Sequence, residues 1–296
     1  MDSVPIAFVD TLCTTLQKKD LKELQKIENR WLRTVGTHCS RRRELAVRLN
    51  PNDDETEVGI RIYEGMDGKT PVPYTTLTKY DRIRLISIKR FHRQLLPDTI
   101  SMERFRSKVL PVLSSLTDVV EVQAPVTSSK NLVESVWNVL CAPAAVIETG
   151  YTGQKCGEFI ERQIRIGYLG KLKLHGDEWP ESIKVTLKSF LKSSNYVYLD
   201  LFSTLTIDLD MFICIVESFL NGDLYRKIHL YGKPSDEMKE LYEALLSGGT
   251  FTLLERLPEP SSITRGRSLC EIQWTRSHTY RLRALLSAKQ LSVYRI

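Results

Sequence analysis

Residues 171–230 read KLKLHGDEWPESIKVTLKSFLKSSNYVYLDLFSTLTIDLDMFICIVESFLNGDLYRKIHL, and this stretch decides the fold. It repeats one pattern, a short strand core with alternating apolar side chains followed by an amphipathic helical segment. The strand cores lie at residues 171–174, 198–201 and 227–230. The interval from Leu174 to Leu201 is 27 residues, and that from Leu201 to Leu230 is 29 residues. A strand–helix period in the twenties is typical of leucine-rich-repeat solenoids.

The same pattern extends in both directions from this stretch. We predict further strand cores at residues 84–88, 119–122, 145–147 and 250–254. Pro180 predicts the start of one helix, with Ile183, Val185, Leu187 and Leu191 facing inward. Asp208 or Asp210 opens a second helix that Asn221-Gly222 closes, and Ser235-Asp236 opens a third that Gly248-Gly249 closes.

The alternation predicts an α/β fold in which an N-terminal helical module precedes an irregular, leucine-rich-repeat-like β/α solenoid. A doubly wound sheet fits the same alternation, but it favours a glycine-rich phosphate-binding turn after its first strand, and the sequence has none. Residues 45–49 and 58–62 alternate like strands around a turn-rich loop and predict a hairpin that covers the open end of the solenoid. We therefore divide the chain into residues 1–45, 46–80 (hairpin and linker) and 81–296 (repeats).

The N-terminal segment has the apolar spacing of two short helices. Phe8, Leu12 and Leu16 lie four residues apart, and Asp20 with Glu23 resembles a capping pair that starts the second helix. Val35-Gly36 predicts its end. Two helices of this length cannot bury both apolar faces, so these faces pack on the rest of the chain or on another protein.

These residues resemble the F-box family. Its pattern of an apolar-Pro pair, spaced aliphatic residues, an acid-Leu start and a final Arg-Trp is matched here by Val4-Pro5, Phe8, Leu12, Leu16, Asp20-Leu21, Leu24, Ile27 and Arg30-Trp31. The opening MDSVP is similar to the large nematode-expanded groups of F-box proteins. The resemblance implies docking on the Skp-family adaptor of a cullin–RING ubiquitin ligase. The implied contact residues are Val4, Pro5, Phe8, Val9, Leu12, Leu16, Leu21, Leu24, Ile27 and Trp31.

The C-terminal segment is strongly basic. The chain has a net charge of +6, and residues 262–296 carry seven bases against one acid, Glu271. Bases and aromatic residues alternate there, as on RNA-binding surfaces. Leu282, Leu285, Leu286 and Leu291 instead predict an amphipathic helix that closes the solenoid. The arginines that could bind an acidic target are Arg265, Arg267, Arg276, Arg281 and Arg283.

The composition of the chain and the absence of common motifs limit the classes of function that we expect. The chain is 42% hydrophobic and 26% charged, which is typical of a globular protein, and no apolar run approaches the roughly 18 residues of a membrane span. The six scattered cysteines predict reduced thiols, mostly in the core, in the cytosol or nucleus. The motifs of the common hydrolases, nucleotide-binding proteins and zinc proteases are absent. We therefore expect no enzyme, no cofactor and no metal.

Three functions remain to be compared. The first is a substrate-recognition subunit of a ubiquitin ligase, whose N-terminal module docks the Skp-family adaptor and through it a cullin, while the repeat face binds an unknown target protein. The second is a nucleic-acid-binding protein that uses the basic C-terminal segment, with an affinity that falls steeply with salt. The third is an α/β enzyme, which predicts a deep pocket with ionisable groups of shifted pKa.

Overall fold

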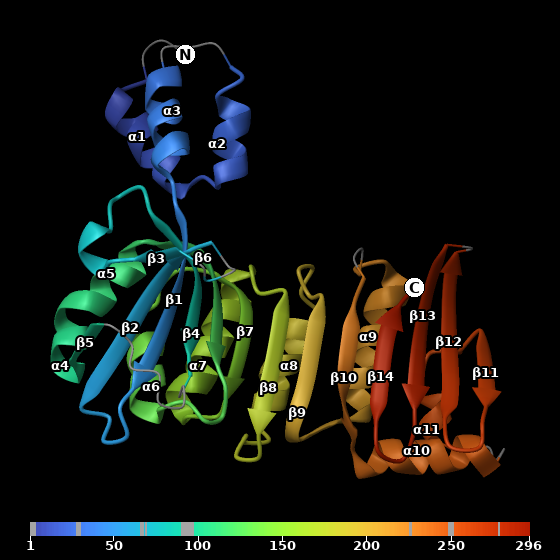
Figure 1. Cartoon of the computed structure of the whole chain (residues 1–296). Coiled ribbons are helices and arrows are strands. Elements are labelled where there is room, and N and C mark those ends of the chain that lie inside the picture. Colours follow the sequence, from blue (N-terminus) through green and yellow to red (C-terminus); the bar gives the residue numbers. More distant parts are fainter. Residues whose placement is uncertain are drawn as a thin grey trace. The chain divides into compact units, whose positions relative to one another are not determined.

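The fold is described from a computed structural model of the 296-residue chain. The structure describes residues 4–27, 31–65, 68, 70–89, 98–224, 227–247, 252–277 and 279–296. Backbone contacts divide the chain into two compact units. Unit 1 comprises Met1–Gln123 and Ser128–Pro143, and unit 2 comprises Ala124–Thr127 and Ala144–Ile296. Figure 1 shows the elements of both units.

Unit 1 contains a mixed sheet in addition to the N-terminal helices. Its strands are β1 (Glu44–Pro51), β2 (Glu57–Glu64), β3 (Thr70–Val72), β4 (Arg82–Ile88), β5 (Asp98–Ser101) and β6 (Thr117–Ala124). The predicted hairpin is present, because β1 and β2 pair antiparallel with Leu45 opposite Glu64. Strand β1 also pairs parallel with β4, and β4 with β6, so the hairpin continues the parallel sheet. Strands β3 and β5 both pair with β2.

The remaining elements of unit 1 are helical. They are the 3₁₀ turn η1 (Tyr74–Thr76), α4 (Met102–Arg104), the π-helical turn η2 (Phe105–Val109), α5 (Leu110–Ser115) and α6 (Lys130–Val139). Helix α6 begins where the Ser129 hydroxyl accepts a hydrogen bond from the Leu132 amide at 3.2 Å. This N-cap satisfies one of the amides that the first turn leaves without a helical partner.

Unit 2 contains the repeated stretch. Strands β7 (Ala144–Gly150), β8 (Lys171–Gly176), β9 (Tyr198–Ile207) and β10 (His229–Pro234) pair in parallel, each with the next in sequence. The connections contain α7 (Gln154–Ile166), α8 (Ile183–Leu191) and α9 (Leu209–Asn221), and α10 (Asp236–Ser247) and α11 (Thr252–Glu255) follow β10. Figure 1 shows α8 and α9 behind these strands. The strand order advances without the reversal that defines a doubly wound sheet.

Alternation along the strands places the core of unit 2 on one face of the sheet. Leu172, Leu199 and Leu230 lie on adjacent strands and are fully buried, together with Leu187 of α8 and Phe212 of α9. Burial of such side chains at about 1.5–3 kcal/mol each is the main favourable term in forming this layer. The opposite face of the strands carries polar and aromatic side chains.

Most of the predicted start and end residues of the helices are confirmed. The Asp208 carboxylate caps α9 by accepting a hydrogen bond from the Met211 amide at 2.8 Å. Gly222 ends the same helix in the left-handed conformation, with φ of 88°. The Ser235 hydroxyl accepts from the Met238 amide at the start of α10. Helix α8 begins at Ile183, three residues after Pro180, and the prediction that Val185 faces inward is wrong, because it is 72% exposed.

Two predictions for the C-terminal part are wrong. Residues 252–255 form helix α11 and not a strand, while residues 250–251 and the predicted stop at Gly248-Gly249 lie outside the described residues. The predicted closing helix is a pair of strands, since Leu282, Ala284 and Leu286 alternate as buried side chains with a period of two. Strands β11 (Ser262–Arg265), β12 (Cys270–Ser277), β13 (Tyr280–Leu286) and β14 (Leu291–Arg295) form an antiparallel meander whose β14 pairs with β10.

The fold class is therefore mixed α/β, as the alternation predicts. The strands of unit 2 follow the order β7-β8-β9-β10-β14-β13-β12-β11. Five of the six cysteines are buried, in agreement with the prediction that they fill the core. None of the described helices combines the length and the apolar composition that crossing a lipid bilayer requires.

Candidate functional site

The N-terminal module has three helices where the sequence predicts two. They are α1 (Ile6–Thr15), α2 (Lys18–Leu24) and α3 (Leu32–Arg41), and α3 packs against both of the others. The Val35-Gly36 pair lies inside α3, so the prediction that it ends a helix is wrong. Arg30 of the F-box-like pattern lies outside the described residues. The sequence does not predict the third helix, because its buried positions include His38 and Cys39, and these residues do not form an apolar stripe in the sequence.

Asp20 occupies a different capping position from the predicted one. Helix α2 begins after Gln17, whose side chain and backbone take part in a capping box with Asp20 as the third helical residue. The Gln17 amide donates to Asp20 Oδ2 at 3.2 Å. The capping pair is therefore Gln17 with Asp20, and not Asp20 with Glu23.

The three helices form a small apolar core of their own. Its buried members are Val9, Cys13, Leu21, Val35 and Cys39, and the partly buried Val4, Leu16, Leu24 and Trp31 pack against them. The ten predicted contact residues thus divide into two groups, six that belong to this core or pack against it and four that do not. The structure places Val9 and Leu21 inside the module, with exposed fractions of 3% and 0%, where no partner can reach them.

The other group of predicted contact residues is exposed. The exposed fraction is 58% for Phe8, 41% for Leu12 and 53% for Ile27, and Pro5 is also exposed. Among the described residues, fifteen large apolar side chains are exposed, and five of them lie in this short module: Ile6, Phe8, Leu12, Ile27 and Leu32. Phe8 and Leu12 are four residues apart and lie on the same side of α1. Apolar surface concentrated in this way is typical of protein-interaction sites.

Two buried arginines hold the C-terminal end of α1. Arg42 donates from Nη2 to the carbonyl of Cys13 at 2.6 Å and from Nη1 to the carbonyl of Leu16. Arg82, at the start of β4, donates to the carbonyl of Thr14 from Nε at 2.8 Å and from Nη2 at 2.5 Å. These carbonyls belong to the last turn of the helix, which has no helical donors for them and carries partial negative charge.

Burial lowers the pKa of both guanidinium groups, since the charged form is less stable away from water. The exposed fraction is 1% for Arg42 and 4% for Arg82. An arginine stays charged even so, because its ordinary pKa lies far above neutrality. The two charges are therefore stabilised by the carbonyl oxygens of α1, and α1 is fixed to the sheet of unit 1 by the same hydrogen bonds.

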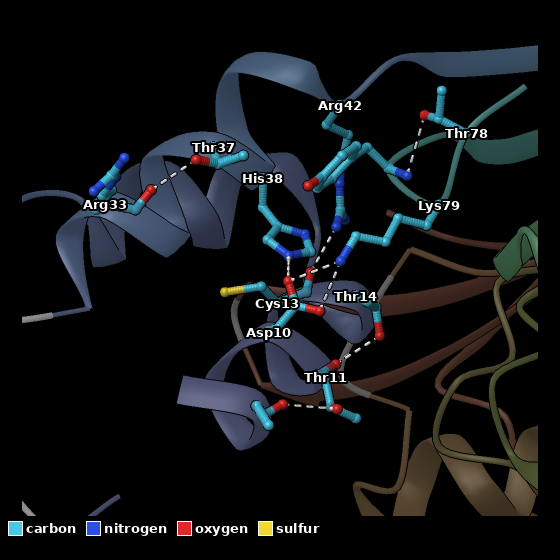
Figure 2. Close-up of polar contacts among 12 residues, drawn as sticks. Asp10, Thr11, Cys13, Thr14, Arg33, Thr37, His38, Arg42, Thr78 and Lys79 are labelled. Atoms are coloured by element: carbon cyan, nitrogen blue, oxygen red, sulfur yellow. Dashed lines mark hydrogen bonds and ion pairs between the residues drawn. The ribbon is translucent and has the colours of Figure 1, made fainter. Parts of the chain in front are cut away.

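A second polar contact holds the middle of α1. Figure 2 shows the His38 ring and the Lys79 ammonium both directed at the Asp10 carboxylate. His38 Nε2 lies 2.8 Å from Asp10 Oδ1, and Lys79 Nζ lies 2.9 Å from Asp10 Oδ2. The hydrogen bond to His38, followed by that to Lys79, lowers the pKa of Asp10. The fully buried His38 also contacts the ring of Tyr80.

The five arginines predicted to bind a target are all on unit 2 but do not form one group. Arg265 and Arg267 lie at the end of the β12–β13 pair where Cys270 faces Leu286. Arg276 and Arg281 lie at the opposite end of the pair, and Arg283 lies between. The antiparallel strands that replace the predicted helix separate these side chains along the sheet.

Three of these arginines have partners within the unit. Arg265 Nε donates to the carbonyl of Leu245 at 2.6 Å. Arg283 Nε donates to Glu271 Oε1 at 2.5 Å. The guanidinium of Arg276 lies over the C-terminus of α9, since a Cβ placed on Gly222 would be 2.5 Å from Arg276 Nη1. A guanidinium at this end of a helix stabilises the last carbonyls.

Sequence reasoning missed a second group of polar and aromatic residues, on the outward face of the unit 2 sheet. Strand register aligns them in two rows that cross the strands. One row contains Lys171, Tyr198, His229, Tyr294 and Arg283, and the next contains Lys173, Asp200, Tyr231, Ser292 and Leu285. Alternation within residues 171–175, 198–202 and 229–233 is the signal that could have found them. The pairing of these strands with one another was required to place them side by side.

Ionisable groups on this face have shifted pKa values. Burial, and then the hydrogen bond from the Tyr198 hydroxyl to Asp200 Oδ2 at 2.8 Å, raises the pKa of Tyr198 to about 12. Burial also raises the pKa of Asp200 and lowers that of His229. All three shifts favour the neutral form, as expected for groups that are partly removed from water.

The described part of the chain contains no group of three or more His, Cys, Asp or Glu side chains placed to hold a metal ion. No protein-family model, no curated protein and no solved structure matches the chain.

Proposed function

We propose that the chain is an F-box-type adaptor, whose N-terminal module docks the Skp-family subunit of a cullin–RING ubiquitin ligase and whose unit 2 binds a protein target. The observation that carries the proposal is the exposure of Phe8 and Leu12 on a helix whose other sides are occupied. Val9 and Cys13 face the core of the module, and Asp10 and Thr14 accept hydrogen bonds from the rest of unit 1. The apolar side of α1 is left for another molecule.

The energetics favour a groove between partner helices as the binding site. Phe8, Leu12 and Ile27 retain about half of their surface, so complete burial contributes roughly 1 kcal/mol for each, and Ile6 and Leu32 add similar amounts. Helices that are already folded lose little conformational entropy on binding. An amphipathic helix that fills a hydrophobic groove is a common recognition mode, with anchors spaced by three and four residues.

The arrangement of unit 2 supports the proposal that its strands and helices form a leucine-rich-repeat-like solenoid. Strands β7 to β10 follow one another in sequence and in space, each joined to the next through a helix. Repeats of this kind present one row of side chains per strand on a broad outward face. Such a face suits binding of a protein segment, and the adaptor acts by holding the target near the conjugating enzyme rather than by bond chemistry.

The nucleic-acid alternative relies on the basic C-terminal segment. Its arginines lie at two ends of the β12–β13 pair, and Arg283 is neutralised by Glu271. A phosphate backbone needs a continuous basic track. This separation is the reason that we favour the adaptor.

The test is a direct binding assay between the purified chain and a Skp-family adaptor. The double variant Phe8→Asp/Leu12→Asp removes two anchors and places two charges at the interface, so we expect affinity to fall by about a hundredfold or more. The matched control is Tyr168→Asp/Val185→Asp, which changes two exposed apolar residues of unit 2 and leaves the affinity unchanged.

Circular dichroism checks that both double variants keep the helical content of the wild type. All four substituted side chains are exposed, so the fold does not depend on them. Binding that is equal in the wild type and both double variants, or absent from all of them, contradicts the proposal. Trp31→Ala is a poorer probe, because Trp31 packs against the core of the module and its loss would also destabilise the helices.

A further inference from the structure

An irregularity in β9 opens a pocket on the outward face of unit 2. Gly232 of β10 pairs with Leu201 of β9, but the next residue, Lys233, pairs with Thr206. Residues 202–205 thus leave the pairing with β10 near the C-terminal ends of the two strands. Interruptions of this kind redirect side chains and are frequent beside binding sites. Here Phe202 becomes 54% exposed at the edge of the pocket.

The pocket has a volume of about 330 Å³. Phe202 and Tyr231 line one part of it, with ring centroids 5.5 Å apart. Lys233 from β10 and Lys289 from the turn between β13 and β14 line another part, and Asp177, after β8, is a third charged residue. We call this site the Phe202 pocket. Its volume is at the lower end of the range for ligand sites and fits one or two amino-acid side chains.

Charge pairing on the outward face leaves the two lysines available. Elsewhere on this face Lys173 lies 3.6 Å from the carboxylate of Glu148, and Arg283 pairs with Glu271. Neither the Lys233 nor the Lys289 ammonium forms an ion pair or a hydrogen bond with the described residues. Two cations from different elements at one pocket repel each other, and an anion between them removes that repulsion.

We propose that the Phe202 pocket binds a carboxylate carried next to an apolar group, as a glutamate-containing segment of a target protein presents it. The ammonium groups of Lys233 and Lys289 bind the carboxylate, and the rings of Phe202 and Tyr231 pack against the apolar part. The identification of the ligand as a target segment rests on the proposed adaptor function, while the chemistry of the pocket stands on its own residues.

The charges favour a single carboxylate over a nucleic acid. With Asp177 among the lining residues, the pocket holds two positive charges and one negative charge. One monoanion leaves this set neutral, whereas a phosphate chain needs basic groups that continue beyond the pocket. The neighbouring row of the sheet instead contains Asp200 and the paired Lys173 and Glu148.

The experiment is saturation-transfer difference NMR on the full chain with blocked peptides. The first probe is acetyl-Gly-Phe-Glu-Gly-amide, and the comparison peptides replace its glutamate with glutamine, with phosphoserine or with lysine. A further peptide, acetyl-Gly-Phe with a free carboxyl terminus, distinguishes a chain end from a side chain as the source of the carboxylate. We expect the carboxylate peptides to bind with a Kd of about 1 mM or lower, and the glutamine and lysine peptides to bind at least about tenfold more weakly.

Variants of the protein identify the pocket. Lys233→Gln/Lys289→Gln is expected to weaken binding of the glutamate peptide by about tenfold and to abolish its preference over the glutamine peptide. The matched control Lys155→Gln/Lys192→Gln removes the same charge from exposed lysines of unit 2 outside the pocket and leaves both affinities unchanged. Phe202→Ser weakens all the peptides alike, since it removes apolar contact.

Several outcomes overturn the proposal. They are equal binding of the glutamate and glutamine peptides, loss of binding in both double lysine variants, preference for the phosphoserine peptide, and no binding of any peptide at about 10 mM. Tight, salt-sensitive binding of a single-stranded RNA that depends on Lys233 and Lys289 also overturns it. Because the module is unchanged in every variant, failure here leaves adaptor binding intact, and failure of adaptor binding leaves these affinities intact.

Discussion

Replacing Arg82 with methionine tests whether polar contacts hold α1 in place. Arg82 donates to the carbonyls of Thr14, Lys79 and Asp81 through four hydrogen bonds between 2.5 and 2.8 Å. At about 1 kcal/mol net for each bond, their loss costs about 4 kcal/mol. Relief from burying the charge offsets part of this, and methionine preserves most of the apolar stem. We therefore expect Arg82→Met to lower the free energy of unfolding by about 2–3 kcal/mol.

The assay combines thermal unfolding with hydrogen exchange. A loss of this size lowers the midpoint of unit 1 by about 5–10 °C. Amides of α1 are expected to exchange faster, while those of β9 and β10 in unit 2 keep their protection. The control is Arg33→Met on α3, where the exposed side chain has no comparable bonds and the stability changes by less than about 0.5 kcal/mol. An unchanged midpoint together with unchanged exchange in α1 would refute the reasoning.

Further predictions concern unit 2. Gly222→Ala is expected to destabilise the protein by about 1–2 kcal/mol, since φ of Gly222 is 88° and the new Cβ meets Arg276. Gly157→Ala, inside α7 with open space around it, is expected to stabilise the protein by about 0.5–1 kcal/mol. Chemical denaturation measures both changes. The pKa of Tyr198 is raised to about 12, above its unfolded value, so it contributes stability that is complete below pH 10 and is lost as pH rises toward 12. Burial also raises the pKa of Tyr196, so absorbance titration is expected to show more than one late-ionising phenol, of which Tyr198→Phe removes one. Burial lowers the pKa of His229 below 6.5, so its contribution is complete above that pH and is lost as pH falls; an imidazole NMR titration that instead gives a raised pKa contradicts this burial.

The repeated part of the fold could be predicted because segments with the two-residue period of a strand alternate there with segments that have the 3.6-residue period of a helix. Alternating leucines give the strands, and spaced apolar residues with Asp208 and Gly222 give the helix between them. The closing strands could not be predicted with the same rule. Leu285 and Leu286 are adjacent, and with Leu282 they fit a helix as well as a strand, so pairing with β12 and β14 decided the outcome.

The candidate docking surface could be predicted only in part. Spacing groups Phe8, Val9 and Leu12 together, but it does not tell which of them face a neighbouring helix of the same module. The unpredicted helix α3 supplies Val35 and Cys39, and these bury Val9 and leave the other two exposed. The outward face of unit 2 needed still more information, since residues 27 or more positions apart become neighbours only through strand register.

The exposure of Phe8 and Leu12 is maintained by the contacts on the opposite sides of α1. Turning the helix to bury these side chains would remove Asp10 from His38 and Lys79 and would take the carbonyl of Thr14 away from Arg82. The buried His38 and Arg82 would then each lose an acceptor. The cost is about 1–3 kcal/mol for each group, which together matches or exceeds the roughly 2 kcal/mol that burying the rest of both apolar side chains would contribute. Weakening these contacts therefore reduces docking even where no docking residue is changed, because α1 is no longer held with its apolar side outward.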